Sequence, residues 1–443
     1  MRTNTDNVHK LLVATHRPIT GNLLPIVEAM HAKRTAILAL AQQHRTPFYV
    51  IDTEALKQSI ADFHTAFAKS IPNMQTFYAV KSNHHPYLLQ HVVRAGFGLD
   101  VSSGRELALA LPHKPSRILF SGPGKTTAEL ALALAHHTRV TVHMDSFGEL
   151  RRLGALAKKH KKIIRAGIRI FTHFHDPVKK FGIPIEDLHR FFITAKRYPS
   201  IQLEGIQSHL SWSHAPEKYA GVVALIRKEI GTWKPALRSS IQVIDLGGGF
   251  YPNRTEGYYP GRGHYPWMMS KENLIWMADV AYGTATRFPH KYYLTAMPSL
   301  ASYAKTIAHA LKKNIAPLLP DCAYFFEPGR IICSSAMHIV LRIVDVKKFR
   351  QAITDGGINM TGWEFGQHFY TPLVNCTHPA RKEIPYTIHG SLCTPRDVWG
   401  RYVYATRLAE GDVIVAPHQG AYRYALQQEF IKPIPPVYLL KAP

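Results

Sequence analysis

The chain has 443 residues, which is long enough for two or three domains with a large core. Its 46% hydrophobic and 19% charged residues are typical of a globular protein and exclude a disordered one. The net charge of +24 is spread along the chain, with short clusters only at 158–162 and 347–350. We therefore expect no nucleic-acid partner and no membrane partner, and we ascribe the charge to a basic surface or to an acidic substrate.

The N-terminal segment MRTNTDNVHKLLVATHRP lacks the continuous apolar stretch of a secretory signal. The four cysteines, Cys322, Cys333, Cys376 and Cys393, are too scattered for a disulfide framework or a zinc site. The sequence thus predicts a cytoplasmic protein with reduced thiols and no metal.

From residue 75, short β-rich runs alternate with helical segments. The eight strand candidates are TFYAVK, GLDVS, RILFSG, RVTVHMD, RAGIRI, QLEGIQSHL, IQVIDLGGG and AYFFEPGR. Helical periodicity marks 86–95, 126–135, 146–159, 186–196 and 300–311. Eightfold alternation predicts the α/β class and a (β/α)₈ barrel. A doubly wound sheet would need Gly-x-Gly-x-x-Gly after its first strand, and that motif is absent.

The remaining segments predict two further features. The seventh connection, 251–297, is rich in Tyr, Pro, Gly and Trp, which indicates an ordered functional loop. Later strand candidates lack helices between them: MHIVLRIVDVKKF, AITDGG, YTPLVNC, IPYTIHG, DVIVAP and QEFIKPI. We expect a barrel at 46–335 and a C-terminal β domain at 336–443, with segment 1–45 packing against that β domain.

Polar side chains recur where the expected strands end. Because these ends meet at one mouth of a barrel, the side chains are expected to form one site. In chain order they are Lys81, Asp100 with Ser102 and Ser103, Arg169, His209, Gly247, Gly248 and Gly249, Glu327, and Arg330.

This set of groups suits pyridoxal 5'-phosphate (PLP), which needs an amine, a ring-nitrogen partner and a phosphate cradle. Lys81 can form a Schiff base, Glu327 can keep the pyridine nitrogen protonated, and His209 can stack on the ring. Gly247–Gly249 and Arg330 can hold the phosphate.

Each motif also has a plainer interpretation. Glycine triplets often serve tight turns, and a Glu-Pro-Gly-Arg turn is more often a surface turn. The segment GPGKTT (122–127) is similar to a P-loop, but Leu119 stands where the first glycine is required.

The same residues lie in motifs that resemble those of the ornithine and diaminopimelate decarboxylases, PLP enzymes of the alanine-racemase-like fold type III. The motifs are FYAVKSN (77–83), GFGLDVSSGREL (96–107), SGPGKT (121–126), KFGI (180–183), DLGGGF (245–250), EPGR (327–330), CTPRD (393–397) and GAY (420–422). The resemblance runs from about Thr46 to Pro435 and implies an amino-acid decarboxylase.

The resemblance also implies residue roles. Lys81 binds PLP as a Schiff base, Glu327 pairs with the pyridine nitrogen, and His209 stacks on the ring. The phosphate is held by Arg330, Gly247, Gly248, Gly249 and Tyr422, and a supporting shell is formed by Asp100, Glu106 and Arg169. Members of the family are homodimers with shared active sites, in which the cysteine matching Cys393 protonates the product carbon. Without the motif, Cys393 would be an ordinary buried thiol.

Three departures from the family pattern concern the substrate and the phosphate. Thr394 stands where diamino-acid decarboxylases carry an acid, and Trp363 stands where the diaminopimelate enzymes carry an arginine. We therefore count Thr394, Asp397 and Trp363 as candidate substrate-binding residues. The Cys-Thr-Pro version is similar to decarboxylases of siderophore pathways, whose substrates have an acylated distal amine. Trp212 replaces a phosphate-loop serine, for which Ser211 or Ser213 could substitute.

Decarboxylation is the first functional interpretation. Racemisation or epimerisation on the same fold stays open, although racemases usually place an arginine, not Glu327, against the pyridine nitrogen. A non-catalytic homologue would be expected to lack Lys81 or Cys393, and both are present. The sequence does not identify which amino acid is the substrate.

Overall fold

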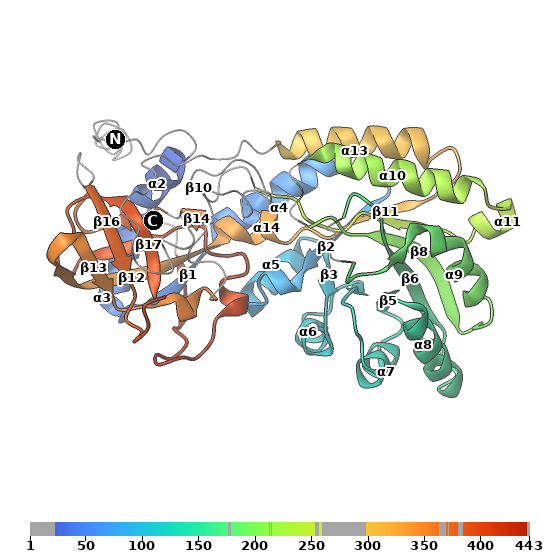
Figure 1. Ribbon diagram of the computed structural model, residues 1–443, viewed down its shortest axis with the longest axis horizontal. Helices are drawn as coiled ribbons and strands as arrows, with labels where there is room; N and C mark the ends of the chain where they lie inside the picture. Colours follow the sequence, from blue (N-terminus) through green and yellow to red (C-terminus); the bar gives the residue numbers. More distant parts are fainter. Residues whose placement is uncertain are drawn as a thin grey trace. The chain divides into compact units, whose positions relative to one another are not determined.

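The computed structural model describes residues 23–175, 179–211, 213, 215–252, 257–258, 298–362, 369–370, 372–379 and 384–440. These residues belong to two compact units (Figure 1). We call the first the β unit (1–55, 253–296 and 334–443) and the second the barrel unit (56–252 and 297–333).

Eight parallel strands close the barrel unit into a cylinder. They are β2 (Met74–Ala79), β3 (Gly98–Val101), β4 (Ile118–Phe120), β5 (Val140–Met144), β6 (Ile164–Phe171), β8 (Ile201–Ser208), β9 (Val243–Asp245) and β11 (Ala323–Phe326), with β7 (Ile183–Pro184) beside β6. Each strand pairs with its neighbour, and β11 pairs with β2, which closes the ring. The predicted (β/α)₈ barrel is therefore confirmed.

Helices connect successive strands and bury one face each. They are α4 (Thr53–Ala68), α5 (Pro86–Arg94), α6 (Gly104–Ala110), α7 (Thr127–Ala135), α8 (Phe147–Lys159), α9 (Leu188–Ala195), α10 (Pro216–Gly231), α11 (Pro235–Arg238), α13 (Leu300–Asn314) and α14 (Arg330–Cys333). In α8 the buried residues Leu150, Leu153 and Ala157 recur at helical spacing, and the Ser146 side chain caps the first turn. None of the described helices is both long and apolar enough to cross a membrane.

The β unit is built around one curled sheet in the order β15-β18-β12-β13-β16-β17. Its strands are β1 (Phe48–Asp52), β12 (Met337–Lys347), β13 (Gln351–Thr354), β15 (Val374–Asn375), β16 (Ile384–His389), β17 (Val398–Ala405), β18 (Val413–Ala416) and β19 (Val437–Leu440); β10 (Gly257–Tyr258) pairs separately with β14 (Phe369–Tyr370). This confirms the predicted second domain of β structure.

Two details of the β unit differ from expectation. Strand β1 lies inside the range expected for the barrel, but its backbone pairs antiparallel with β12 and parallel with β19, so it is part of this sheet. The segment QEFIKPI is not a strand and forms only an isolated bridge between Phe430 and Lys432. Prolines at 433, 435 and 436 lack the backbone donors that a ladder needs.

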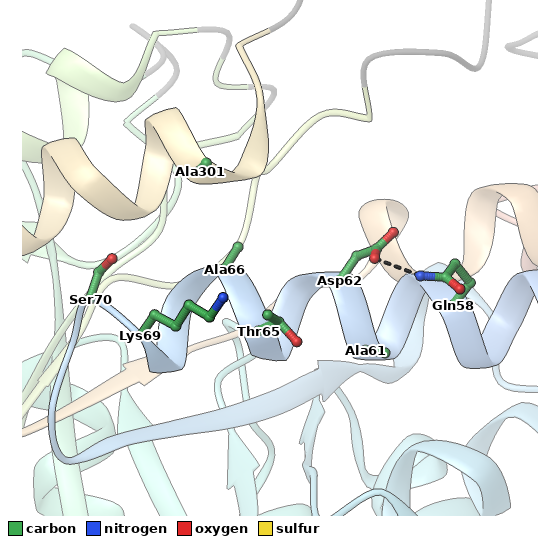
Figure 2. A pocket seen from close by; sticks show the side chains of 8 residues that line it. All are labelled: Gln58, Ala61, Asp62, Thr65, Ala66, Lys69, Ser70 and Ala301. Atoms are coloured by element: carbon green, nitrogen blue, oxygen red, sulfur yellow. Dashed lines mark hydrogen bonds between the residues drawn. The ribbon is translucent and has the colours of Figure 1, made fainter.

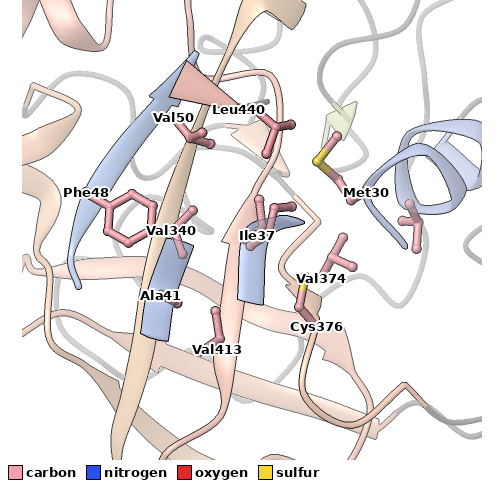
Figure 3. Packing of buried hydrophobic residues seen from close by; sticks show 12 residues of the cluster. Met30, Ile37, Ala41, Phe48, Val50, Val340, Val374, Cys376, Val413 and Leu440 are labelled. Carbon is pink, nitrogen blue, oxygen red and sulfur yellow. The ribbon is translucent and has the colours of Figure 1, made fainter. Parts of the chain in front are cut away.

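The N-terminal helices pack on the β unit, as predicted, from residue 23 onward. Helices α2 (Leu23–Ala32) and α3 (Arg34–Gln43) contribute apolar side chains to one cluster with the sheet (Figure 3). Its buried members are Val27, Met30, Ile37, Ala41, Phe48, Val50, Val340, Val374, Cys376, Val413, Val415 and Leu440. Full burial of one such aliphatic side chain contributes about 1.5–3 kcal/mol, which attaches the helices firmly.

The amino-terminal ends of four consecutive barrel strands carry a basic surface. Segments 111–117, 135–139, 158–163 and 195–200 precede β4, β5, β6 and β8, and they contain no Asp or Glu. Their exposed cations are Lys114, Lys158, Lys159, Lys161, Lys196 and Arg197. We call this surface the basic end of the barrel; it lies opposite the carboxyl ends of the strands.

Candidate active site

Lys81 stands at the carboxyl end of β2, in a short 3₁₀ turn, Val80–Ser82. The turn is fixed from within, because Ser82 Oγ donates to the Ala79 carbonyl (2.7 Å) and Tyr78 Oη donates to the Asn83 carbonyl (3.0 Å). The Lys81 side chain is 32% exposed, and its Nζ lies 3.9 Å from Oδ2 of Asp100 on β3. The strand end therefore presents a reachable amine beside a buried acid.

Asp100 is fully buried and receives a hydrogen bond from Ser121 Oγ. Burial, followed by the negative charge of Glu327, raises the pKa of Asp100 to about 7. Its Oδ2 has no hydrogen-bond partner among the described residues. Asp100 can therefore either bear the charge opposite Lys81 or hold a proton.

Glu327 follows β11 and lies buried inside the mouth of the barrel. Gln207 Nε2 donates to its Oε1 (3.3 Å), and Nδ1 of His209 lies 3.2 Å from its Oε2. Burial favours the neutral acid, but the contact with His209 and the charge of Lys81 outweigh burial and hold the pKa of Glu327 below its usual range. At neutral pH this position is a buried carboxylate.

His209 follows β8 and packs against the glycine turn. The backbone nitrogen of Gly248 lies 3.1 Å from His209 Nδ1, and a Cβ on Gly247 would lie 2.7 Å from that same nitrogen. Burial, then the charge of Lys81, lowers the pKa of His209 to about 4. The ring is therefore a neutral, flat surface at neutral pH.

The turn Gly247–Gly249 needs glycine for steric reasons. Gly247 and Gly249 have φ values of +65° and +86°, which favour glycine. A Cβ on Gly248 would lie 2.2 Å from the Glu327 carbonyl oxygen, and one on Gly249 would lie 1.7 Å from that of Leu210. The triplet is thus a tight turn that brings the backbone close to the mouth of the barrel. This agrees with the interpretation of the glycines as turn residues, and it is also compatible with a role in binding phosphate.

Two residues that sequence reasoning missed lie behind Glu327. His143 on β5 and Asp245 on β9 are buried, with Nδ1 of His143 3.6 Å from Asp245 Oδ2 and 4.0 Å from Glu327 Oε1. Burial lowers the pKa of His143 to about 4, and burial, then the charge of Glu327, raises the pKa of Asp245 well above its usual range. Ligand atoms of the three lie within 4.8 Å of one another, a spacing that a metal ion could also use. The one feature of the sequence that could have identified His143 and Asp245 is their position near the ends of predicted strands.

Two arginines complete the described part of the mouth. Arg169 on β6 is buried, with its guanidinium carbon 4.4 Å from the centre of the Phe181 ring. Arg330 begins α14 and is buried, with its guanidinium 5.1 Å from the centre of the Tyr251 ring. Both cations lie within cation–π distance of an aromatic ring, which helps to hold them in place.

The remaining predicted site residues belong to the β unit. Cys393 is exposed, whereas Cys322, Cys333 and Cys376 are buried. Asp397 is buried, and its two oxygens accept backbone N–H bonds from Ile358 (2.8 Å) and Leu392 (2.6 Å), so it holds the loop that carries Cys393 and Thr394. Tyr422 has a φ of +62° in another loop of the same unit. Trp363, Trp212 and most of the 251–297 connection lie outside the described residues.

The lysine of GPGKTT is structural. Lys125 is buried, and its Nζ donates to the His143 carbonyl (2.7 Å), to Glu149 Oε2 (3.0 Å) and to the Gly122 carbonyl. Glu149 Oε2 also accepts from the backbone N–H of Asp145 (3.0 Å). This buried ion pair joins the loops after β4 and β5, so the segment is not a P-loop.

Replacing Lys125 with methionine should lower the free energy of unfolding by about 3–5 kcal/mol, because the Glu149 carboxylate is left buried and unpaired. Urea unfolding checks this value. The double variant Lys125→Met/Glu149→Leu should recover most of the loss. A double variant as unstable as the single one would show that the ion pair is not the cause.

A shallow hollow on the barrel unit lies apart from these residues. Figure 2 shows it between α4 and α13, lined by Gln58, Ala61, Asp62, Thr65, Ala66, Lys69, Ser70 and Ala301. Gln58 Nε2 donates to Asp62 Oδ1 (2.7 Å), an ordinary contact between successive turns of a helix. None of the predicted site residues lines it, and we assign it no chemistry.

The described mouth fits PLP. Lys81 offers the amine, Glu327 offers a carboxylate for a protonated ring nitrogen, and His209 offers a flat neutral surface. The buried atoms Asp100 Oδ2 and Gln207 Oε1 have no hydrogen-bond partner among the described residues, as expected of a site shaped for a polar group. Fold and site together define a PLP enzyme built on a (β/α)₈ barrel with a β domain.

Comparison with known proteins agrees with this class. Residues 57–262 match the family of the pyridoxal-dependent decarboxylases, pyridoxal binding domain. Over this range the chain is similar to the fold type III group that includes the ornithine and diaminopimelate decarboxylases, and its cofactor is PLP. It is an amino-acid carboxy-lyase.

Individual relatives cover almost the whole chain. The 2-[(L-alanin-3-ylcarbamoyl)methyl]-2-hydroxybutanedioate decarboxylase of Staphylococcus aureus is 27% identical over 418 residues, covering 87% of this chain and 91% of that protein. The diaminopimelate decarboxylase of Bacteroides thetaiotaomicron is 26% identical over 395 residues, covering 85% and 91%. The crystal structure of Helicobacter pylori diaminopimelate decarboxylase, complexed with L-lysine, has a TM-score of 0.70 at 22% identity, covering 88% and 90%.

These matches confirm the predicted fold, cofactor and reaction class. The relatives named here are decarboxylases, and the racemase alternative gains no support from them.

Proposed function

We propose that this enzyme decarboxylates an amino acid whose side-chain end is acylated or carboxylated, as in siderophore pathways. The observation that carries the proposal is Thr394, which directly follows Cys393 where diamino-acid decarboxylases have an acid. The substrate in the name of the Staphylococcus aureus relative supports it, because there the alanine side chain is joined through an amide to a hydroxybutanedioate.

The loop around Thr394 offers no carboxylate for a distal ammonium group. Thr394 is half-buried, and both oxygens of the neighbouring Asp397 accept backbone N–H bonds. A free diamino acid would lose a charge-assisted hydrogen bond worth about 1.5–3 kcal/mol. We therefore assign Asp397 to holding the loop and Thr394 to contacting the far end of the substrate.

The ionisation states of Glu327 and His209 support the roles proposed for the residues of the mouth. Lys81 binds the cofactor through its Nζ, and the ionised Glu327 holds the proton on the ring nitrogen. His209 would face the bound ring, and Asp100 and Arg169 would form the supporting shell of the site. When bound, PLP supplies an electron-accepting ring that stabilises the carbanion left by loss of carbon dioxide.

Further roles complete the proposal. Arg330, Tyr422 and the backbone of Gly247–Gly249 hold the phosphate, and Cys393 Sγ gives its proton to the carbon that lost carbon dioxide. The enzyme is a cytoplasmic homodimer with shared active sites. Cys393 is exposed, whereas the other three cysteines are buried. This exposure supports the proposal that its thiol acts on a group outside its own loop.

A substrate panel tests the proposal. We expect kcat/KM for citryl- or glutamyl-linked diamino acids to exceed that for ornithine, lysine and meso-diaminopimelate by about 10- to 100-fold, the ratio that corresponds to about 1.5–3 kcal/mol. Carbon dioxide release measured by mass spectrometry gives these values.

The matched variant is Thr394→Asp, which restores an acid after Cys393 and should shift the preference toward ornithine or lysine. Cys322→Ala changes a buried residue of the barrel unit and should leave the preference unchanged. High efficiency of the unaltered enzyme on any free diamino acid would refute the acylated-substrate proposal and leave only the decarboxylase class.

A further inference from the structure

The β unit contains a buried Asp–His pair that is not part of the proposed active site. Asp52 ends β1 and His338 lies on β12, where β1 and β12 pair antiparallel. Both side chains are buried, and His338 Nε2 lies 3.6 Å from Asp52 Oδ2. Asp52 is itself held by Lys33 Nζ and by the backbone N–H of Ala55 (3.0 Å).

The other ring nitrogen of His338 faces a loop. The backbone N–H of His418 donates to His338 Nδ1 (3.0 Å), so this nitrogen is unprotonated and the ring proton is on Nε2, toward Asp52. Burial lowers the pKa of His338, which agrees with a neutral ring. The Asp52 carboxylate makes no hydrogen bond with Nε2 among the described residues, but at 3.6 Å its charge favours the tautomer that carries its proton on that side.

That loop, 417–423, has an unfavourable backbone. His418 and Tyr422 have φ values of +57° and +62°, a region that side chains other than glycine seldom adopt. Such a backbone persists only where its surroundings hold it. Further bonds hold the loop against the start of β12, from Gln419 N–H to the Met337 carbonyl (2.7 Å) and from Gly420 N–H to the Ser334 carbonyl (3.1 Å).

We propose that His338, oriented by Asp52, is a positioning residue that holds the 417–423 loop in the conformation in which Tyr422 binds the cofactor phosphate. The inference rests on the proposed function for the role of Tyr422. His338 itself touches neither substrate nor cofactor in this assignment; it acts through the His418 backbone.

The test compares two ligands that differ only in the phosphate. The full-length chain, stripped of cofactor, is titrated with pyridoxal 5'-phosphate and with pyridoxal, and binding is followed by protein fluorescence. His338→Leu removes the acceptor and should weaken binding of pyridoxal 5'-phosphate by about 3- to 10-fold, the range for one lost hydrogen bond. Its affinity for pyridoxal should stay within about twofold of the unaltered chain.

Two variants serve as controls, and a third can replace the test variant. In His338→Asn, the amide oxygen can occupy the place of Nδ1, so binding of pyridoxal 5'-phosphate should be restored. His378→Leu alters another Asp–His pair of the β unit, in which His378 Nδ1 lies 2.6 Å from Asp412 Oδ1, and should leave both affinities unchanged. Should His338→Leu fail to fold, His338→Gln replaces it. The longer glutamine side chain carries its amide past the Nδ1 position, so this variant also lacks the acceptor for the His418 N–H.

Tyr422→Phe separates the two assignments. A selective loss of pyridoxal 5'-phosphate affinity in both Tyr422→Phe and His338→Leu supports the inference. If only Tyr422→Phe is selective, or if His338→Leu weakens both ligands equally, the positioning role is wrong and the phosphate role of Tyr422 stands. If Tyr422→Phe is not selective, the phosphate role fails and the inference falls with it.

Discussion

Lys81→Ala should abolish decarboxylation, with kcat reduced by at least about 10⁴, the upper end of the effect of removing one group that acts directly on the reacting atoms. The reason is chemical, because the variant lacks the reachable strand-end amine beside Asp100 to which the cofactor is assigned. Borohydride reduction of the unaltered holoenzyme followed by peptide mapping should place the cofactor on Lys81, and the variant should carry no such label.

The control for this experiment is Lys159→Ala, which removes an exposed lysine from the basic end of the barrel. It should keep both the label and the activity. Labelling of a lysine other than Lys81 in the unaltered enzyme would contradict the assignment of the cofactor site.

Cys393→Ala should retain PLP but lower turnover by about 10²–10⁴, the range for removal of a general acid. Loss of carbon dioxide should continue slowly, because the proposed role of the thiol comes after the bond breaks. Product formation and carbon dioxide release are measured together by mass spectrometry, with Cys376→Ala, which alters a buried cysteine of the same unit, as the matched variant.

Mixing Lys81→Ala with Cys393→Ala subunits extends this test to the dimer. With shared sites, a hybrid dimer has one site with both residues intact, so random exchange should restore about one site in four. If subunits exchange and activity never returns, Lys81 and Cys393 do not come from different subunits.

Local sequence patterns predicted the barrel because its strands and helices are neighbours along the chain. Alternating runs from TFYAVK to AYFFEPGR therefore corresponded to eight parallel strands. The β unit was harder to predict. Strand β1 was assigned to the barrel because its partners, β12 and β19, lie almost 300 or more residues away in the chain, and no local pattern reveals such pairing. QEFIKPI has strand-like composition, but the prolines around it prevent a ladder.

The site divides in the same way. Lys81, Asp100, His209 and Glu327 were predicted because each marks the end of a strand, and a barrel gathers those ends. His143 and Asp245 also stand near strand ends. Their significance depends on the distance of about 4 Å between Glu327 and the buried imidazole of His143, and that distance is known only from the tertiary structure. The contact of His338 with the His418 backbone joins positions 80 residues apart, and composition gives no hint of it.

The basic end of the barrel has a consequence for handling the enzyme. Its lysines and arginines are gathered at one pole of the barrel unit, whereas the carboxylates of Asp100 and Glu327 are buried at the other. On a cation-exchange resin, or on a negatively charged sensor chip, this pole is attracted first. Salt strong enough to screen these lysines would weaken that attraction and release the enzyme.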